Sequence, residues 1–166
     1  MWIRSETDAD HAAIRRVVEA AFAQAPHASG TEAQIVDTLR RDEALTVSLV
    51  ADIDGRIAGH VAASPVTIAG ADGWHGLGPV AVAPQDQGHG VGSALVQAAL
   101  AELRAAGSQG CVVLGEPRYY ARFGFEAVPG LTYPDAPPEY FMALAFGDSL
   151  PQGAVAYHAA FASDRD

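Results

Sequence analysis

Residues 80–103 read V-A-V-A-P-Q-D-Q-G-H-G-V-G-S-A-L-V-Q-A-A-L-A-E-L, which predicts a strand, a glycine-rich turn and then a helix. The turn places glycines at positions 88, 90 and 92, where the helix begins. Glycine accepts a positive φ and lets a ligand approach the backbone closely. A helix N-terminus presents unpaired N–H groups and a partial positive charge. This stretch therefore predicts an anion site, suited to a phosphate group.

The composition is that of a folded globular protein, and we expect one domain spanning residues 1–166. The chain is 49% hydrophobic, with a mean hydropathy of +0.09. Its formal net charge is -10, and it contains no lysine. That balance argues against nucleic acid and anionic membranes as partners. A bound anion would have to be held by local backbone amides, because the overall field repels it.

Targeting and metal signals are not found in the sequence. No apolar run approaches the roughly 18 residues of a membrane span, and the first residues do not resemble a signal peptide. We therefore expect a cytoplasmic protein. A lone cysteine, Cys111, excludes an intrachain disulfide and most zinc sites, so no metal is predicted.

Apolar spacing and turn residues outline the elements. Asp54-Gly55 predicts a hairpin between two strands, and a third strand follows, so the middle of the chain is an antiparallel meander. Ser29 and Glu32 resemble a capping box for the second helix. The expected strands are Trp2–Thr7, Val47–Ile53, Arg56–Ile68, Gly76–Ala83, Cys111–Gly115, Tyr140–Phe146 and Ala154–Phe161. Two helices are expected to begin at Thr7 or Asp8 and near Glu32. Two more are expected to span Val91–Ala106 and Pro117–Phe123. This is an α+β pattern.

Two other phosphate-binding motifs do not fit the glycine turn. A P-loop requires a lysine, which this chain lacks. A dinucleotide fingerprint would place glycine or alanine at position 93, where Ser93 stands, and no acidic residue follows at the required distance.

The turn does resemble the acetyl-CoA signature of the Gcn5-related N-acetyltransferase (GNAT) family. Gln87-x-x-Gly90-x-Gly92 matches the family's (Gln/Arg)-x-x-Gly-x-(Gly/Ala) pattern, and Tyr120-x-x-x-Gly124-Phe125 matches its later Tyr-x-x-x-Gly-Phe element. The amino-acid sequences of both regions are most similar to those of the YhbS-like predicted acetyltransferases. The resemblance covers essentially the whole chain. It implies a mixed, mostly antiparallel sheet of about seven strands flanked by about four helices.

The resemblance also implies where acetyl-CoA would bind. The backbone of the glycine turn would hold the pyrophosphate, and the pantetheine arm would lie between splayed fourth and fifth strands, here Val80–Val82 and Leu114–Glu116. Pro79 supports such a splay because proline cannot donate to a ladder. The implied cofactor-binding residues are Val80, Ala81, Val82, Gln87, Gly88, His89, Gly90, Val91, Gly92, Ser93 and Tyr120.

By the same resemblance, Tyr120 would be the general acid toward the CoA thiolate, and the oxyanion would lie near the backbone N–H of Val82 or of a neighbour on that strand. Motif spacing favours Tyr120 over its neighbour Tyr119. Glu116, at the end of the fifth strand, can accept the amine proton directly or through water, or can simply cap the short helix. His60 and His89 have intrinsic pKa values suited to a general base, but their positions in a meander strand and in the glycine turn are less suited to that role.

Arg118 and Arg122 remain either surface charges or phosphate partners. Glu32, Asp135 and Glu139 are candidates to hold an ammonium group, and each can equally be a solvated acid. The sequence predicts acetyl transfer to a small-molecule amine or a peptide or protein amine, in a monomer or homodimer. The alternative is a non-catalytic CoA-binding sensor or interaction module with the same fold.

Overall fold

The computed structural model of the chain describes residues 1–23 and 30–165. Its main sheet has the strand order β1-β2-β3-β5-β6-β8 and a second sheet the order β4-β9-β7. The main-sheet strands are β1 Trp2–Ser5, β2 Val47–Ile53, β3 Arg56–Pro65, β5 Trp74–Val82, β6 Gly110–Leu114 and β8 Phe141–Ala145. The smaller sheet contains β4 Thr67–Ile68, β7 Leu131–Thr132 and β9 Gly153–Ala156. The predicted α+β class is confirmed, with the strands divided between two sheets.

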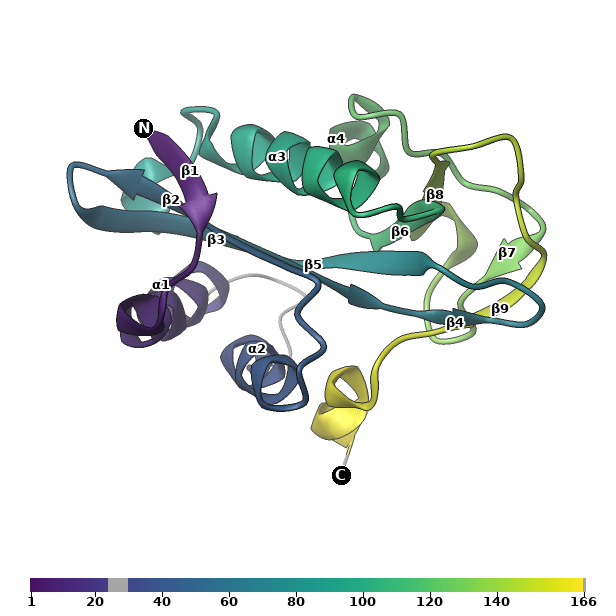
Figure 1. The fold of residues 1–166 in the computed structure, drawn as a ribbon, viewed down its shortest axis with the longest axis horizontal. Coiled ribbons are helices and arrows are strands. Elements are labelled where there is room, and N and C mark those ends of the chain that lie inside the picture. Colours follow the sequence, from purple (N-terminus) through teal and green to yellow (C-terminus); the bar gives the residue numbers. More distant parts are fainter. Residues whose placement is uncertain (24–29, 166) are drawn as a thin grey trace.

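Helices cover both faces of the main sheet (Figure 1). α1 (His11–Phe22) and α2 (Glu32–Arg41) lie on one face, and α3 (Val91–Ala105) and α4 (Pro117–Ala121) lie on the other. A 3₁₀ segment, Ala159–Arg165, packs beside α2. No helix in the described part of the chain is both long and apolar enough to cross a membrane.

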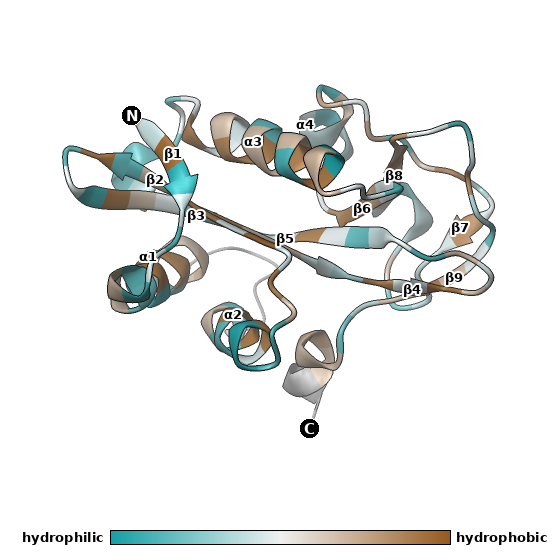
Figure 2. Cartoon of the chain, viewed as in Figure 1, coloured by the Kyte–Doolittle hydropathy of each residue, from teal (hydrophilic) through white to brown (hydrophobic). Residues whose placement is uncertain are grey.

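The apolar stripe of α3 holds the helix on the sheet. Leu95, Ala99 and Leu103, spaced by four residues, are fully buried against sheet residues such as Val61. Burying one leucine side chain contributes about 1.5–3 kcal/mol. In Figure 2, hydrophobic residues are present both along α3 and along the strands of the sheet that it covers. This packing fixes the position of α3 and, with it, the glycine turn at its N-terminus.

The predicted meander is confirmed in β2, β3 and β5, which pair antiparallel. At the hairpin tip, Asp54 and Gly55 have φ values of +52° and +84°. A two-residue hairpin turn of this kind needs positive φ at both positions, which aspartate and glycine tolerate. The turn residues thus explain why the sequence pattern identified this hairpin correctly.

Two expected strands are shorter than their apolar runs. The expected strand Arg56–Ile68 is two strands, because β3 pairs with β5 only as far as Pro65, whereas Thr67 and Ile68 pair with β9. Ala154–Phe161 also divides into β9 and the start of the 3₁₀ segment, with Tyr157 and Phe161 outside the sheet. Apolar alternation indicates a strand without naming its partner, so the second sheet and the two-residue β7 were not predicted. Ser29 of the expected capping box lies outside the described residues.

The predicted splay is present between β5 and β6. These strands pair in parallel only where Trp74–Leu77 faces Gly110–Val113. Beyond Gly78 and Pro79, β5 continues to pair with β3 while the end of β6 pairs with β8. Pro79 has no N–H to donate across the gap. A wedge of unpaired sheet therefore opens next to the N-terminus of α3.

A polar network anchors α2 to the sheet. Arg40 donates two hydrogen bonds of 2.8 Å to the Glu6 carboxylate. Glu6 also accepts a hydrogen bond from the Ser48 hydroxyl, and Ser48 Oγ lies 2.8 Å from His60 Nε2. A bidentate pair of this kind holds α2 at a defined angle. Its N-terminal residue, Glu32, is thereby held close to the splay.

Candidate active site

The glycine turn adopts the left-handed geometry that only glycine accepts without strain. Gly88 has φ +81° and Gly90, the N-cap of α3, has φ +84°. The first helical ladder bond at this end runs from the Ala94 N–H to the Gly90 carbonyl at 3.1 Å. The amides of residues 91–93 therefore lie ahead of the helix ladder and point off its end. The predicted anion seat has the required backbone form.

A cavity of about 400 Å³ lies over this end of α3, and we call it the α3 cavity. Seven of its lining residues are implied by the family signature: Val82, Gln87, Gly88, Gly90, Val91, Gly92 and Ser93. Asp86, Tyr119 and Arg122 complete the lining. Gln87 also donates a 3.1 Å hydrogen bond to the Val82 carbonyl, which ties the turn to β5.

The charges around the α3 cavity favour an anion despite the acidic chain. Asp86 is paired with Arg56 at 2.5 Å, and this hydrogen bond lowers the pKa of the Asp86 carboxyl. Arg122 donates a 3.3 Å hydrogen bond to Ser93 Oγ and lies 4.7 Å above the Tyr119 ring. Arg122, which the sequence left open, thus adds a positive charge to the helix N-terminus.

A larger cavity of about 530 Å³ occupies the wedge between β5 and β6, and we call it the splay cavity. Strand residues and Tyr120 form part of its lining, and segments from both ends of the chain form the rest. It is lined by Phe22, Glu32, Ile35, Leu77, Gly78, Pro79, Val80, Leu114, Tyr120, Tyr133, Asp135, Tyr157 and Phe161.

The two neighbouring tyrosines of α4 serve different cavities. Tyr119 lines the α3 cavity, and its hydroxyl lies 2.9 Å from the position that a Cβ on Gly92 would take. Tyr120 lines the splay cavity instead. Adjacent helix positions point about 100° apart, so one helix turn presents a ring to each cavity.

Packing fixes the Tyr120 ring. It contacts Phe125 edge-on, with ring centroids 5.9 Å apart, and Phe125 is buried in the core. A Cβ on Gly115 would lie 2.5 Å from Tyr120 Cε2, so only glycine leaves room for the ring there. Burial raises the pKa of Tyr120 to about 12. The phenol is therefore protonated throughout the neutral range and can donate a hydrogen bond into the cavity.

The backbone of β5 also faces the wedge. His60 and Ala81 stand opposite each other, and the Ala83 N–H donates to the Ala58 carbonyl at 2.8 Å. In an antiparallel ladder this makes His60 and Ala81 the bonded pair and turns the N–H groups of Val80 and Val82 away from β3. Those two groups point toward the opening left by β6.

Three of the predicted catalytic and cofactor-binding residues lie outside both cavities. Ala81 is fully buried in the cluster beneath α1. His89 is exposed at the tip of the turn. Glu116 is exposed at the N-cap of α4, where its side chain makes no capping hydrogen bond. The roles assigned to them remain predictions.

The structure also places the other candidates. His60 is fully buried beside Ser48, and burial lowers its pKa to about 4. Within residues 1–23 and 30–165, no three histidine, cysteine or carboxylate side chains lie close enough to hold a metal ion. The aromatic lining from Tyr133, Tyr157 and Phe161 was missed, because sequence spacing carries no signal for residues joined only by tertiary contact.

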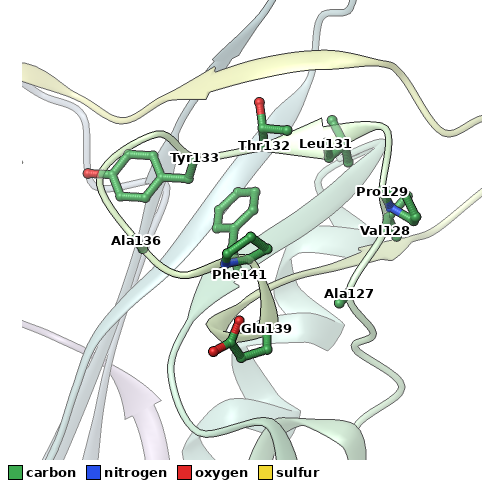
Figure 3. Close-up of a pocket in the computed structure, with 10 residues that line it drawn as sticks. Ala127, Val128, Pro129, Leu131, Thr132, Tyr133, Ala136, Glu139 and Phe141 are labelled. Carbon is green, nitrogen blue, oxygen red and sulfur yellow. The ribbon is translucent and has the colours of Figure 1, made fainter.

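A further cavity of about 460 Å³, with a mostly apolar lining, is lined in part by Tyr133 (Figure 3). Tyr133 lines both this cavity and the splay cavity. Its ring packs 5.6 Å from that of Phe141, and Glu139 borders the same space. Glu139, an expected candidate to bind an ammonium group, is thus outside the splay cavity.

Comparison with known proteins agrees with this geometry. Residues 2–128 match the family model described as an acetyltransferase (GNAT) domain. An uncharacterized N-acetyltransferase, YhbS, from Escherichia coli K12 is 40% identical over 128 residues, covering 76% of this chain and 74% of that protein.

Two solved structures are similar over nearly the whole chain. A GNAT family acetyltransferase from Brucella melitensis, in complex with acetyl-CoA, is 52% identical with a TM-score of 0.86, covering 96% of this chain and 97% of that one. Escherichia coli YhbS, in complex with CoA, is 34% identical with a TM-score of 0.88, covering 97% and 91%. The chain belongs to the GNAT N-acetyltransferase family.

Proposed function

We propose that this protein transfers an acetyl group from acetyl-CoA directly to a primary amine in a ternary complex. The observation that carries the proposal is the meeting of two cavities along one strand. Val82 of β5 lines the α3 cavity and Val80 lines the splay cavity, while α4 contributes Tyr119 to the first and Tyr120 to the second. A candidate phosphate seat thereby lies next to a wedge whose lining includes the Tyr120 phenol.

The residues present fit acetyl-CoA as a substrate. The amides at the start of α3, with Arg122, suit the pyrophosphate. The wedge has unpaired β5 backbone along one side, and an extended arm can add to such an edge as a strand would. The solved relatives in complex with acetyl-CoA and CoA support the same assignment.

The chemistry requires an electrophile, a neutral amine and a proton for the leaving thiolate. In the proposed reaction the Val82 N–H donates to the developing oxyanion. The amine nitrogen forms the C–N bond, the C–S bond breaks, and Tyr120 gives its proton to the thiolate. The nitrogen then loses its second proton, and Tyr120 is reprotonated, so that one proton is released for each ammonium acetylated.

Glu116 is our sequence-based candidate for the general base, acting directly or through water, and its exposed place at the N-cap of α4 favours the route through water. Glu116→Gln should then shift the acidic limb of the pH profile of kcat. An unchanged profile would leave proton removal to solvent.

Binding and turnover test the proposal in sequence. A ligand that binds the native state raises the melting temperature by mass action. Acetyl-CoA and CoA should raise it, whereas NAD and ATP should not, and the absence of a shift with either CoA species overturns the proposal. If CoA binds but no amine in a broad panel releases its thiol, the protein is a non-catalytic CoA sensor.

A further inference from the structure

Part of the splay cavity comes from segments that are far apart in the chain. Phe22 ends α1, Glu32 and Ile35 begin α2, Tyr133 and Asp135 follow β7, and Tyr157 and Phe161 follow β9. We call these seven residues the acceptor wall. They line the same cavity as Tyr120, so a molecule bound against them shares that cavity with the proposed proton donor.

The acceptor wall is strongly aromatic. The rings of Tyr133 and Tyr157 stack with centroids 5.2 Å apart. Phe161 meets Tyr157 edge-on at 5.1 Å. Rings held by their neighbours offer apolar area at a low entropic cost on binding. This surface suits an apolar body and offers little to a polyhydroxylated or highly charged chain.

Among the described residues, the charged side chains that line the splay cavity are both acidic. They are the carboxylates of Glu32 and Asp135. The whole chain carries a formal net charge of -10, which attracts cations toward such a cleft. An ammonium group is therefore favoured here.

A buried hydroxyl completes the wall. Tyr157 Oη is inaccessible to solvent and has no hydrogen-bond partner within the described part of the chain. Its ring reaches β5, where Tyr157 Cζ would lie 3.4 Å from a Cβ on Gly76. Buried polar groups nearly always have a partner. Tyr157 also lines the splay cavity, so a polar atom of a molecule bound there could provide the missing partner.

We propose that the acceptor is a primary amine carried on an aromatic or branched apolar body. Its ammonium group lies beside Glu32 and Asp135, and its body lies on the rings of Tyr133, Tyr157 and Phe161. This proposal rests on the proposed function and adds the substrate class. Loss of one proton from the ammonium group gives the neutral nitrogen that attacks the thioester.

The first test compares amines under the same conditions by thiol release from acetyl-CoA. 2-Phenylethylamine represents the proposed class, ethanolamine lacks the apolar body, and spermidine and a lysine-containing peptide represent polycations and proteins. Burial of the phenyl group should give 2-phenylethylamine a kcat/KM about 100-fold above that of ethanolamine. A preference for spermidine or the peptide overturns the proposal.

The second test uses the acceptor wall itself. Asp135→Asn and Glu32→Gln should each raise the KM for 2-phenylethylamine about tenfold, with the Kd for acetyl-CoA unchanged. Tyr157→Phe should alter the KM for the amine and not the affinity for acetyl-CoA. Glu102→Gln, an exposed position on α3, is the matched control and should change neither constant.

Calorimetry with 2-phenylethylamine and the CoA-loaded protein separates the two proposals. Failure to bind acetyl-CoA overturns the proposed function. Normal acetyl-CoA binding without saturable amine binding, or amine constants that are unchanged in all three wall variants, overturns this inference alone. Saturable binding that weakens in Asp135→Asn and Glu32→Gln supports it even where turnover is slow.

Discussion

The rings of Tyr119 and Tyr120 lie with centroids 5.0 Å apart and planes at 89°, and they border different cavities. Replacing each hydroxyl separately should therefore give different kinetic results. Tyr120→Phe should lower kcat by about ten- to a hundredfold because it removes the proton donor to the thiolate. Tyr119→Phe should leave kcat unchanged. Steady-state kinetics of both variants test the assignment, and wild-type turnover in Tyr120→Phe would remove that residue from the mechanism.

The raised pKa of Tyr120, about 12, predicts the alkaline behaviour of the enzyme. Burial disfavours the phenolate, so the proton needed by the leaving thiolate remains available well above pH 9. We expect kcat to rise to a plateau with pH and to show no decline from Tyr120 between pH 7 and about pH 10. A pH profile of kcat measures this, and a decline that is abolished in Tyr120→Phe would contradict it.

Arg122 should act on cofactor affinity and not on the chemical step. Arg122, the C-cap of α4, lines the α3 cavity beside Ser93, whereas Arg118 of α4 lines neither the α3 cavity nor the splay cavity. Arg122→Gln should raise the Kd for acetyl-CoA about five- to tenfold, as the loss of one charged hydrogen-bond partner does. Arg118→Gln is the control. Calorimetric titration compares the Kd of the two variants for acetyl-CoA. Equal Kd values would show that Arg122 does not contribute to acetyl-CoA binding.

A side chain at Gly90 should cost both binding and stability. The position has φ +84° with nothing within 4 Å of a Cβ, so the penalty arises from backbone conformation and not from crowding. For Gly90→Val we expect a loss of about 1–3 kcal/mol in the free energy of unfolding, and loss of the acetyl-CoA-induced thermal shift. Gly70→Val, in a turn with φ +74°, is the control. It should lose stability and keep the shift.

His60 should make the fold sensitive to mild acid. Burial lowers its pKa from 6.5 to about 4, while Glu6 acts to raise it and Arg40 to lower it. The His60 side chain therefore becomes protonated near pH 6.5 in the unfolded chain but only near pH 4 in the folded chain. Its contribution to the free energy of unfolding is fully present above pH 6.5 and decreases as the pH falls toward 4. Between pH 7.5 and pH 5 the loss is about 2 kcal/mol.

Urea unfolding of wild type and His60→Asn at both pH values measures this contribution. The variant should have a lower free energy of unfolding at pH 7.5 and a smaller difference between the two values. His89→Asn, at an exposed position, should behave as wild type. A variant with the full wild-type pH dependence would show that another group is responsible.

Local signals in the sequence determined the elements and the phosphate seat. Asp54 and Gly55 form the hairpin because both tolerate positive φ, and the glycines at 88 and 90 form the turn for the same reason. The apolar spacing of α3 determined which of its faces is buried. Each of these signals lies within a few residues, so it can be read from one stretch of chain.

The tertiary structure alone decided what the wedge contains. Tyr119 and Tyr120 are neighbours in sequence, and only the direction of α4 assigns them to different cavities. Phe22, Asp135 and Tyr157 are separated by more than a hundred residues of chain from first to last, and only folding brings them to one cavity. The sequence determined the turn proposed to hold a phosphate because backbone conformation is local. Packing between distant segments decided the shape and lining of the cavity proposed to hold the amine.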